Sequence, residues 1–191
     1  MEPRQLLDAL IIAERLKDTT RHCYTTKGRH ESVAEHSWMT SLMVFFMQDE
    51  FKEADMNKVM KMCIIHDLGE AFTGDIPTFL KTKDHEKKEE ELLNNWIKSL
   101  PEHYTKEMTE LYQEMSELKT LEAKIFKAID KLEALIQHNM SDISTWIPEE
   151  YELNQTYAHD QVAFSKYLMS LRQEILEDTL QKIAENEENL K

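Results

Sequence analysis

Glycine and proline are scarce in this sequence, which has 3 Gly and 4 Pro among its 191 residues. Average usage would give roughly 13 Gly and about 10 Pro at this length. All-β folds rely on these residues for tight turns, so the shortage argues against a sandwich or a barrel. A mostly helical chain is expected instead.

Cysteine is also scarce, because Cys23 and Cys63 are the two in the chain. They are too few and too far apart for a disulfide framework, and free thiols in a reducing compartment fit them best. The early apolar stretch 6–13 contains Asp8 and runs into Glu14, which matches neither a secretory signal nor a membrane span. A cytoplasmic location without a membrane partner is expected.

Positive charge is outnumbered, with 23 Lys and Arg against 37 Asp and Glu and a formal net charge of −14. Proteins that bind nucleic acid through its phosphates need a basic face, so polymeric nucleic acid is not expected as a partner. The segment 18–31 is the exception, since Arg21, Lys27 and Arg29 fall in it. It is predicted to be an ordered or ligand-ordered loop that can receive a small phosphate.

Hydrophobic residues make up 41% of the chain, which is enough for a single core. The prediction is an all-α, single-domain helical bundle over 1–184 with a C-terminal tail, 185–191, that frays. Apolar periodicity and capping signals predict helices over about 4–17, 33–50, 55–67, 84–100, a short one around 111–115, one of about twenty residues from 118, and a last one over 162–183. The segment 140–158 between the last two is interpreted as a long connection, a candidate lid or covering loop.

A His66-Asp67 pair directly follows the apolar run 62–65. Burying an imidazole with a carboxylate is costly unless each finds a partner, and a divalent cation satisfies both. Taken alone, such a pair is more often structural, with Asp67 capping a turn and His66 hydrogen-bonded in the core. Whether the pair marks a metal site depends on which other side chains can approach it.

Two further residues strengthen the interpretation of a metal site. His36 stands in the first turn after a Ser32–Glu35 capping box, where antiparallel packing would bring it against His66. Asp130 interrupts an otherwise apolar helix face and is expected to point inward, although pairing with Lys127 or Lys131 at the surface is an equal alternative. Two imidazoles and two carboxylates would suit one divalent ion, with Mn, Fe, Co, Ni, Mg and Zn as candidates.

The sequence HDLGEAFTGDIPT concentrates further polar groups beside this pair. Glu70 lies four residues after His66, so a continued helix would place its carboxylate over the same site. Gly69 and Gly74 bracket the stretch 70–73, and Asp75 follows with a second free carboxylate. Two carboxylates that are not ligands can divide the work at an activated water, one orienting or deprotonating it and the other protonating the leaving group.

His36, His66-Asp67 and Asp130 reproduce the H…HD…D pattern of HD-domain metal-dependent phosphohydrolases, and HDLGEAFTGDIPT resembles the bacterial 5′-deoxynucleotidase branch. The resemblance extends from about residue 21 to residue 130. It implies that His36, His66, Asp67 and Asp130 bind the metal and that Glu70 positions or activates the attacking water. It also implies an all-helical fold and, as is common in the family, a homodimer.

The same resemblance implies roles for residues that meet the substrate. Arg21 would orient the phosphate, which agrees with the preference of phosphate for a guanidinium fork. Asp75 would donate a proton or contact the sugar. His22 stands where the bacterial branch tends to carry Trp, at a position that contacts base or sugar. The remaining substrate-lining residues would be Ile76, Pro77 and Thr78.

Four other histidines occupy polar or terminal contexts and are expected at the surface or in caps: His85, His103, His138 and His159. Two of them could build a second metal site, as in dinuclear relatives, but the extra histidines that those relatives carry soon after the HD pair are not found.

The function predicted from the sequence is a metal-dependent phosphomonoesterase acting on small nucleotides. The expected substrates are 2′-deoxyribonucleoside 5′-monophosphates, attacked by a metal-bound water. Two alternatives remain at this point: an HD-type hydrolase of another phosphate ester or of a nucleoside triphosphate, and a noncatalytic helical module in which the metal serves only stability or sensing.

Overall fold

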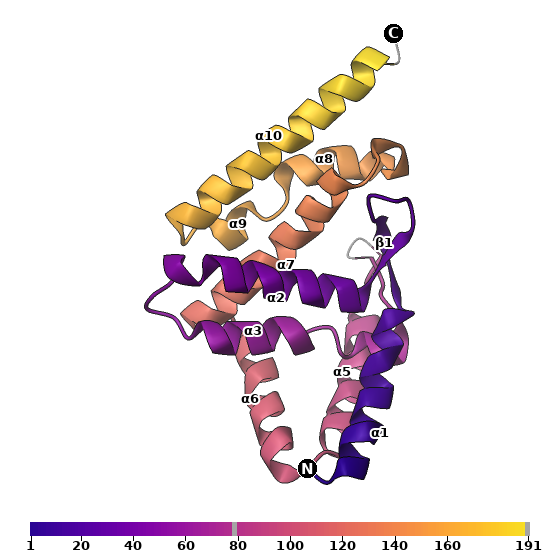
Figure 1. Ribbon diagram of the computed structural model, residues 1–191, viewed down its shortest axis with the longest axis vertical. Coiled ribbons are helices and arrows are strands. Elements are labelled where there is room, and N and C mark those ends of the chain that lie inside the picture. The colour runs from indigo at the N-terminus through magenta and orange to yellow at the C-terminus, as the bar shows by residue number, and fades with distance from the viewer. Residues whose placement is uncertain (78–79, 190–191) are drawn as a thin grey trace.

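The computed structural model describes residues 1–77 and 80–189 and is built almost entirely of helices (Figure 1). In chain order the elements are α1 (Pro3–Glu14), η1 (Arg15–Lys17), β1 (Thr20–Tyr24), β2 (His30–Ser32), α2 (Val33–Met47), η2 (Gln48–Glu50), α3 (Met56–Ile65), α4 (Glu70–Thr73), α5 (Lys83–Ile97), α6 (Glu102–Glu117), α7 (Leu121–Met140), η3 (Ile143–Thr145), α8 (Pro148–Thr156), α9 (His159–Val162) and α10 (Lys166–Asn189). The all-α prediction is confirmed.

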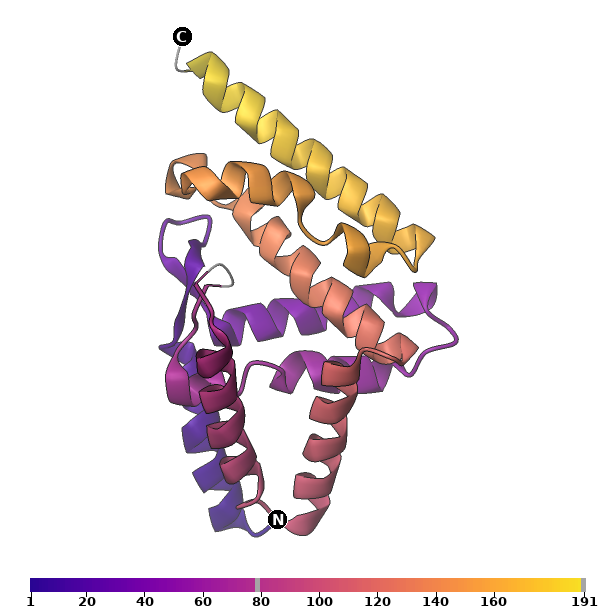
Figure 2. The ribbon, with the colours of Figure 1, turned by 180° about the vertical axis from the view of Figure 1, so that it is seen from behind.

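Helix α7 is the central element, packing against α2, α3, α6 and α10. Figures 1 and 2 show it crossing the molecule from the region of α6 to that of α8 and α10. Thr120 caps its start by accepting a hydrogen bond from the backbone N–H of Ala123 at 3.2 Å. Its apolar residues recur every three or four positions, so one face enters the core, including the fully buried Ile125, Ile129 and Leu132.

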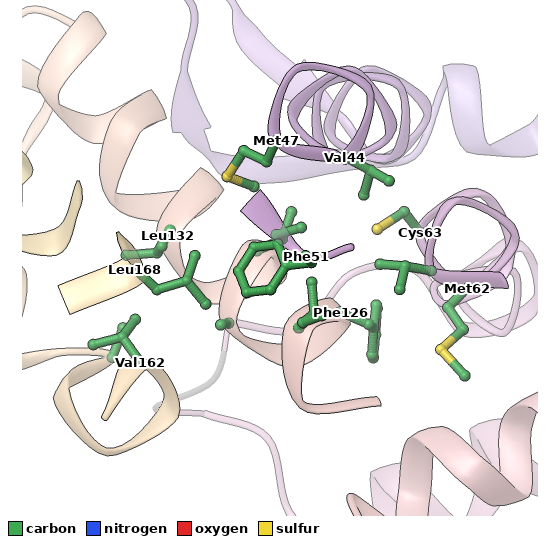
Figure 3. Packing of buried hydrophobic residues seen from close by; sticks show 14 of the residues in the cluster. Val44, Met47, Phe51, Met62, Cys63, Phe126, Leu132, Val162 and Leu168 are labelled. Atoms are coloured by element: carbon green, nitrogen blue, oxygen red, sulfur yellow. The ribbon is translucent and has the colours of Figure 1, made fainter. Parts of the chain in front are cut away.

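The main core lies where α7 meets α2, α3, α9 and α10 (Figure 3). Phe51, which follows η2, lies among the core side chains, and Phe126 and Leu132 of α7 are part of the same cluster. Burial of one such side chain contributes about 1.5–3 kcal/mol. In the apolar run 62–65, Met62 and Cys63 are fully buried whereas Ile64 is 54% exposed, so α3 packs on one face and is not surrounded.

A smaller apolar cluster fixes the turn that carries the His66-Asp67 pair. Leu68 and Ala71, just after the pair, pack with Leu93 and Ile97 of α5 and with Leu16 of η1. Helices α1 and α5 thereby hold the segment after α3 from the side opposite to the main core.

The 18–31 segment forms a hairpin, not the predicted loop. Strands β1 and β2 pair antiparallel, with Thr20 opposite Ser32 and Tyr24 opposite His30. Gly28 turns the chain at φ +77°, a conformation that favours glycine. The sequence did not predict these strands because their polar side chains lack the alternating apolar pattern that indicates a strand.

Other boundaries differ from the prediction in understandable ways. Helix α3 ends at Ile65, before the His66-Asp67 pair, and the helix expected around 111–115 extends over the sixteen residues of α6. Much of the segment 140–158 is helical, in η3 and α8. The C-terminal tail expected to fray from residue 185 is helical through Asn189, helped by a Gln181–Glu185 side-chain hydrogen bond of 2.8 Å.

Arg172 of α10 hydrogen-bonds to the C-terminal end of α8. The buried guanidinium donates hydrogen bonds to the backbone carbonyls of Asn154, Gln155 and Tyr157 at 2.8–3.0 Å. Carbonyls at a helix end lack intrahelical partners, so these bonds satisfy groups that burial would otherwise leave unpaired. Helix α8 is therefore a fixed wall of the molecule. Among the described helices, none has both the length and the apolarity needed to cross a membrane.

Both cysteine thiols are predicted to resist modification in the folded protein. Cys23 is 3% exposed and Cys63 is fully buried, and burial raises the pKa of each thiol to about 12. Because the thiolate is the reactive form, a disulfide reagent such as Ellman's should titrate no thiol at pH 8 in the native state and two after unfolding in guanidinium. Rapid reaction of either thiol in the native state would contradict the packing.

Candidate functional site

Four side chains predicted as metal ligands meet at one point. His36 comes from the first turn of α2, His66 caps the end of α3, Asp67 follows in the next turn, and Asp130 lies midway along α7. The two His Nε2 atoms are 3.2 Å apart. Asp67 Oδ2 lies 3.0 Å from His66 Nε2, and Asp130 Oδ1 lies 3.4 Å from His36 Nε2. The structure thus brings together residues separated by up to 94 positions in the sequence.

Hydrogen bonds on the far side of each imidazole orient its Nε2 toward this point. His36 Nδ1 hydrogen-bonds to the Glu133 carboxylate, and both residues are fully buried. His66 Nδ1 donates to the backbone carbonyl of Cys63 at 2.9 Å. A neutral imidazole that donates from Nδ1 keeps a lone pair on Nε2, which is the arrangement found at metal-binding histidines.

The two carboxylates at this point are held ionised. Although burial opposes ionisation, His66 and His36 lower the pKa of Asp67. Lys131 and Lys127 likewise overcome burial and lower the pKa of Asp130. The same negative charge acts on His36, since Glu133 and Asp130 raise its pKa to about 10 against the opposing effects of burial and Arg21.

The chemistry of this donor set fits a divalent cation. It offers two imidazole nitrogens and two carboxylate oxygens, which suit several first-row metals and leave coordination positions open. The environment already favours positive charge between the ligands, so a metal ion would replace a proton there.

Asp130 combines the two roles that the sequence left open. Its Oδ1 faces the histidines, while its Oδ2 accepts a hydrogen bond from Lys127 at 2.9 Å and lies 3.7 Å from Lys131. The side chain is 13% exposed, so it is neither a surface partner alone nor enclosed in the core. The two lysines lower the cost of keeping a carboxylate at this depth.

A cavity of about 410 Å³ opens beside the four residues. Glu70, at the start of α4, and Asp75 both line it. Burial, reinforced by Asp67 and Asp75, raises the pKa of Glu70 to about 9. Burial also raises the pKa of Asp75. Burial therefore favours the protonated form of both carboxyls more than in water, and a carboxyl with a raised pKa can serve as an acid or a base in proton transfer.

Backbone geometry explains why the glycines bracket Glu70. A Cβ on Gly69 would lie 2.8 Å from Cγ of Glu89 on α5, so a side chain there would require the Glu89 side chain to move. Gly74 has φ +78° and ψ 163°, a region open essentially to glycine alone, and it turns the chain toward Asp75. One Glu70 oxygen, Oε2, is buried without a hydrogen-bond partner among the described residues, which marks it as available to a bound molecule.

Arg21 reaches the cavity from the hairpin. Its Nε lies 3.2 Å from Oε2 of the buried Glu31, an oxygen that also accepts a hydrogen bond from the Cys23 thiol at 3.2 Å. Burial would lower the pKa of the guanidinium, but Glu133, Cys23, Glu31 and Asp67 raise it, so Arg21 stays charged. A guanidinium fixed at Nε presents its remaining N–H groups as a fork for an anion.

A second cavity of about 330 Å³ adjoins the first, because Arg21, Asp75, Asp130 and Lys131 line both. Its other walls are more apolar and come from α7, α8 and the hairpin. Among its lining residues are His22, Pro77, Leu135, Leu153 and Tyr157. Ile76 lines the first cavity instead, and Thr78 lies outside the described residues.

Sequence reasoning missed several of these residues. Glu133 lies three positions after Asp130 on the same helix face, a spacing that could have identified it. Glu31 and Lys81 gave no comparable signal. His138 was expected at the surface but is buried at 7% exposure, whereas His85 does cap α5, His103 is 80% exposed and His159 is exposed.

The chain is similar in sequence to a known protein family and to named relatives. The model of a family described as HD domain matches residues 13–172. The human protein named 5′-deoxynucleotidase HDDC2 is 29% identical over 138 residues, which cover 70% of this chain and 67% of the human one. The match thus spans about two thirds of that relative's length.

Solved structures share the fold. The crystal structure of a predicted metal-dependent phosphohydrolase from Magnetospirillum magnetotacticum superposes with a TM-score of 0.77 at 23% identity, over 94% of this chain and 95% of that one. The HD phosphohydrolase DatZ of cyanophage S-2L, bound to dA and one catalytic Zn²⁺, superposes with a TM-score of 0.54 at 18% identity, over 97% and 98%. The family match and the shared helical fold show that this chain belongs to the HD domain family.

Proposed function

We propose that this protein is a metal-dependent phosphohydrolase that removes the phosphate from 2′-deoxyribonucleoside 5′-monophosphates. The observation that carries the proposal is the single cavity into which Arg21, Glu70 and Asp75 project beside the paired His66-Asp67 and Asp130. The deoxynucleotide substrate is inferred from the similarity to the human 5′-deoxynucleotidase.

In this proposal His36, His66, Asp67 and Asp130 hold one divalent ion, and Glu133 positions His36. A bound ion supplies Lewis acidity and lowers the pKa of water next to it. Mn, Fe, Co, Ni, Mg and Zn all remain candidates because nitrogen and oxygen donors accept each of them.

The chain's own residues then divide the remaining work. Arg21 binds nonbridging phosphate oxygens. Lys81, which pairs with Glu89 at 2.9 Å, lines the same cavity and adds positive charge there. A divalent ion bound next to Glu70 would favour its ionised form. The Glu70 carboxylate then accepts the proton of the attacking water, and Asp75 gives a proton to the departing 5′ oxygen. The second cavity, with its more apolar walls, takes the sugar and base, where His22 and Pro77 are the proposed contacts. Ile76 would contact the substrate from the first cavity, and Thr78 stays a proposed contact on the basis of the sequence. Most of the rate would come from positioning and charge neutralisation.

The noncatalytic alternative explains less of the structure. A metal held only for stability does not require Glu70, whose Oε2 is buried without a partner among the described residues, nor Arg21 directed into the cavity. Buried charged groups of this kind cost stability and are typical of active sites. A hydrolase of nucleoside triphosphates would use the same groups, so an activity assay is needed to distinguish it from the proposed enzyme.

The activity is predicted to release inorganic phosphate and a nucleoside from deoxynucleoside monophosphates assayed with Mn, Co, Mg or Zn. Arg21→Ala should lower kcat/KM by on the order of 10²-fold or more, as loss of one preorganised charged donor does. The matched control is Arg29→Ala, because Arg29 lies in the turn of the same hairpin, is exposed and pairs with Glu35 of α2. Release of pyrophosphate or triphosphate from triphosphates, with monophosphates left intact, would identify the rival hydrolase, and full activity of metal-free protein would refute the proposal.

Removal of the carboxylate behind His36 should weaken metal binding. Glu133→Gln replaces a buried charge with an amide of the same size, and loss of such an orienting partner typically costs about 10–100-fold in metal affinity. Titration calorimetry with Mn²⁺ or Co²⁺ measures this, and activity should return toward the original value at saturating metal. Glu174→Gln on the exposed face of α10 is the control. If the two variants bound the metal ion with equal affinity, the proposed role of Glu133 in positioning His36 would be wrong.

We also propose a homodimer formed through α1. None of the residues of α1 is buried, and its outer face carries an apolar stripe of four side chains that are 48–57% exposed: Leu6, Leu7, Leu10 and Ile11. A continuous apolar stripe on a helix favours packing against a second one. A reducing, cytoplasmic location is proposed on the basis of the two free buried cysteines.

The dimer is testable by mass. In multi-angle light scattering the protein should have about twice the 22.7 kDa of one chain, and Leu7→Glu/Ile11→Glu should reduce it to one chain. Leu180→Glu/Met169→Glu is the matched control, since these α10 residues are 45% and 44% exposed. A monomeric wild-type protein, or dissociation by the α10 changes only, would exclude the α1 interface.

A further inference from the structure

Outside the proposed active site, three side chains from distant parts of the chain form a second cluster of metal-ligating groups. His22 comes from β1, His138 from the last turn of α7, and Glu150 from the first turn of α8. His22 Nε2 lies 2.5 Å from Glu150 Oε1, and His138 Nε2 lies 3.5 Å from the same oxygen. One ligand atom from each residue lies within 4.8 Å of the other two. We call these residues the hairpin cluster.

Glu150 is held so that one oxygen serves both histidines. Its Oε2 accepts a hydrogen bond from the backbone N–H of Ile147 at 2.9 Å at the start of α8, which leaves Oε1 directed at the imidazoles. Burial opposes ionisation, but the His22 hydrogen bond, His138 and the Ile147 N–H lower the pKa of Glu150. The carboxylate is therefore charged and only 1% exposed.

His138 is buried, with 7% of its surface exposed. The Trp146 ring closes one side of it at a centroid distance of 6.1 Å, and the Trp146 indole N–H donates to the His138 backbone carbonyl at 3.1 Å. The indole ring packed beside the imidazole restricts the orientation of the His138 ring.

The opposite side of the cluster faces the second cavity, which both His22 and His138 line. His22 is the more accessible ligand, with a side chain 35% exposed, so an ion can enter from the cavity. Three protein ligands that leave one position open toward a cavity are the pattern of accessible zinc sites, and two histidines with one glutamate are among their usual ligand sets.

We infer that His22, His138 and Glu150 bind a zinc-type divalent ion in a second site whose remaining position opens into the second cavity. The site shares no ligand with the group formed by His36, His66, Asp67 and Asp130, and the inference does not depend on the proposed phosphohydrolase activity. It also differs from a metal pair built by histidines close to the HD dipeptide, because its ligands come from the hairpin and from the two elements after Asp130.

Such an ion would link three elements of the fold more strongly than the hydrogen bonds alone do. Residues 22, 138 and 150 belong to three elements, and α8 also contributes Leu153 and Asn154 to the wall of the second cavity. A bound ion would tie α8 to the hairpin and to α7 across that cavity. Because it would bind the folded chain preferentially, it would raise the melting temperature as its concentration rises.

The experiment compares zinc content after equilibration and desalting with thermal unfolding of the same samples. The wild-type protein is expected to retain two zinc ions per chain, and Glu150→Gln one. Asp67→Ala should also retain one, and addition of zinc should raise its melting temperature. The double variant Asp67→Ala/Glu150→Gln should retain none and show no zinc-dependent shift. His103→Gln, which removes an exposed histidine, should behave as the wild type.

Cobalt substitution gives an independent readout of the ligands. In the Asp67→Ala background Co²⁺ should give visible absorption of a site with nitrogen and oxygen ligands, and His22→Gln should abolish it. His22→Gln removes the most exposed of the three ligands, so circular dichroism should show an intact helical fold even if Glu150→Gln fails to fold. One zinc per chain in both wild type and Glu150→Gln or His22→Gln, with none in Asp67→Ala, would overturn the inference and reduce the hairpin cluster to a hydrogen-bonded contact.

Discussion

The contact between His36 and Glu133 is the constraint on which the rest of the structure depends. Both side chains are fully buried, one on α2 and the other on α7. Removing either partner would leave an unpaired polar or charged group at this depth, which costs about 3–5 kcal/mol in comparable buried pairs. Helices α2 and α7 are therefore fixed in rotation as well as in distance, and Asp130, one turn before Glu133, is brought to face His36.

Charge around this contact is compensated locally, although the chain as a whole is strongly acidic. Arg21 faces Glu31, Lys127 and Lys131 face Asp130, and the two histidines face Asp67. Where burial outweighs the nearby cations the pKa is raised instead, to about 9 for Glu70 and to about 7 for Glu31 despite its contact with Arg21. The net charge that disfavours a polymeric nucleic acid is thus compatible with a cavity where a small anion meets fixed cations.

The structure shows where two of the few glycines are needed. The low count predicted a helical chain, and the fold confirms it. Gly69 leaves room for the Glu89 side chain of α5 beside the turn after His66-Asp67, and Gly74 adopts a backbone conformation open essentially to glycine. Two of three glycines therefore shape the segment that carries Glu70 and Asp75. Most helices were predictable to within a few residues because apolar periodicity and caps act locally, although α6 was predicted too short and α8 was not predicted. The hairpin escaped prediction because its strands are short and polar.

The sequence by itself determined the helical class and the helix that carries Asp130, because each depends on spacing within one element. The set of residues that lie beside the cavity was predicted by the resemblance of short motifs to a known family. Tertiary structure alone decided which groups stand behind that set and what else is buried. Glu31 supports Arg21 across the hairpin, and His138, expected at the surface, lies against His22 and Glu150. Those residues lie on separate elements, and a local pattern carries no information about which elements will pack together. Burial and pairing across elements set their protonation, so the chemistry of the hairpin cluster emerges only once the helices are in place.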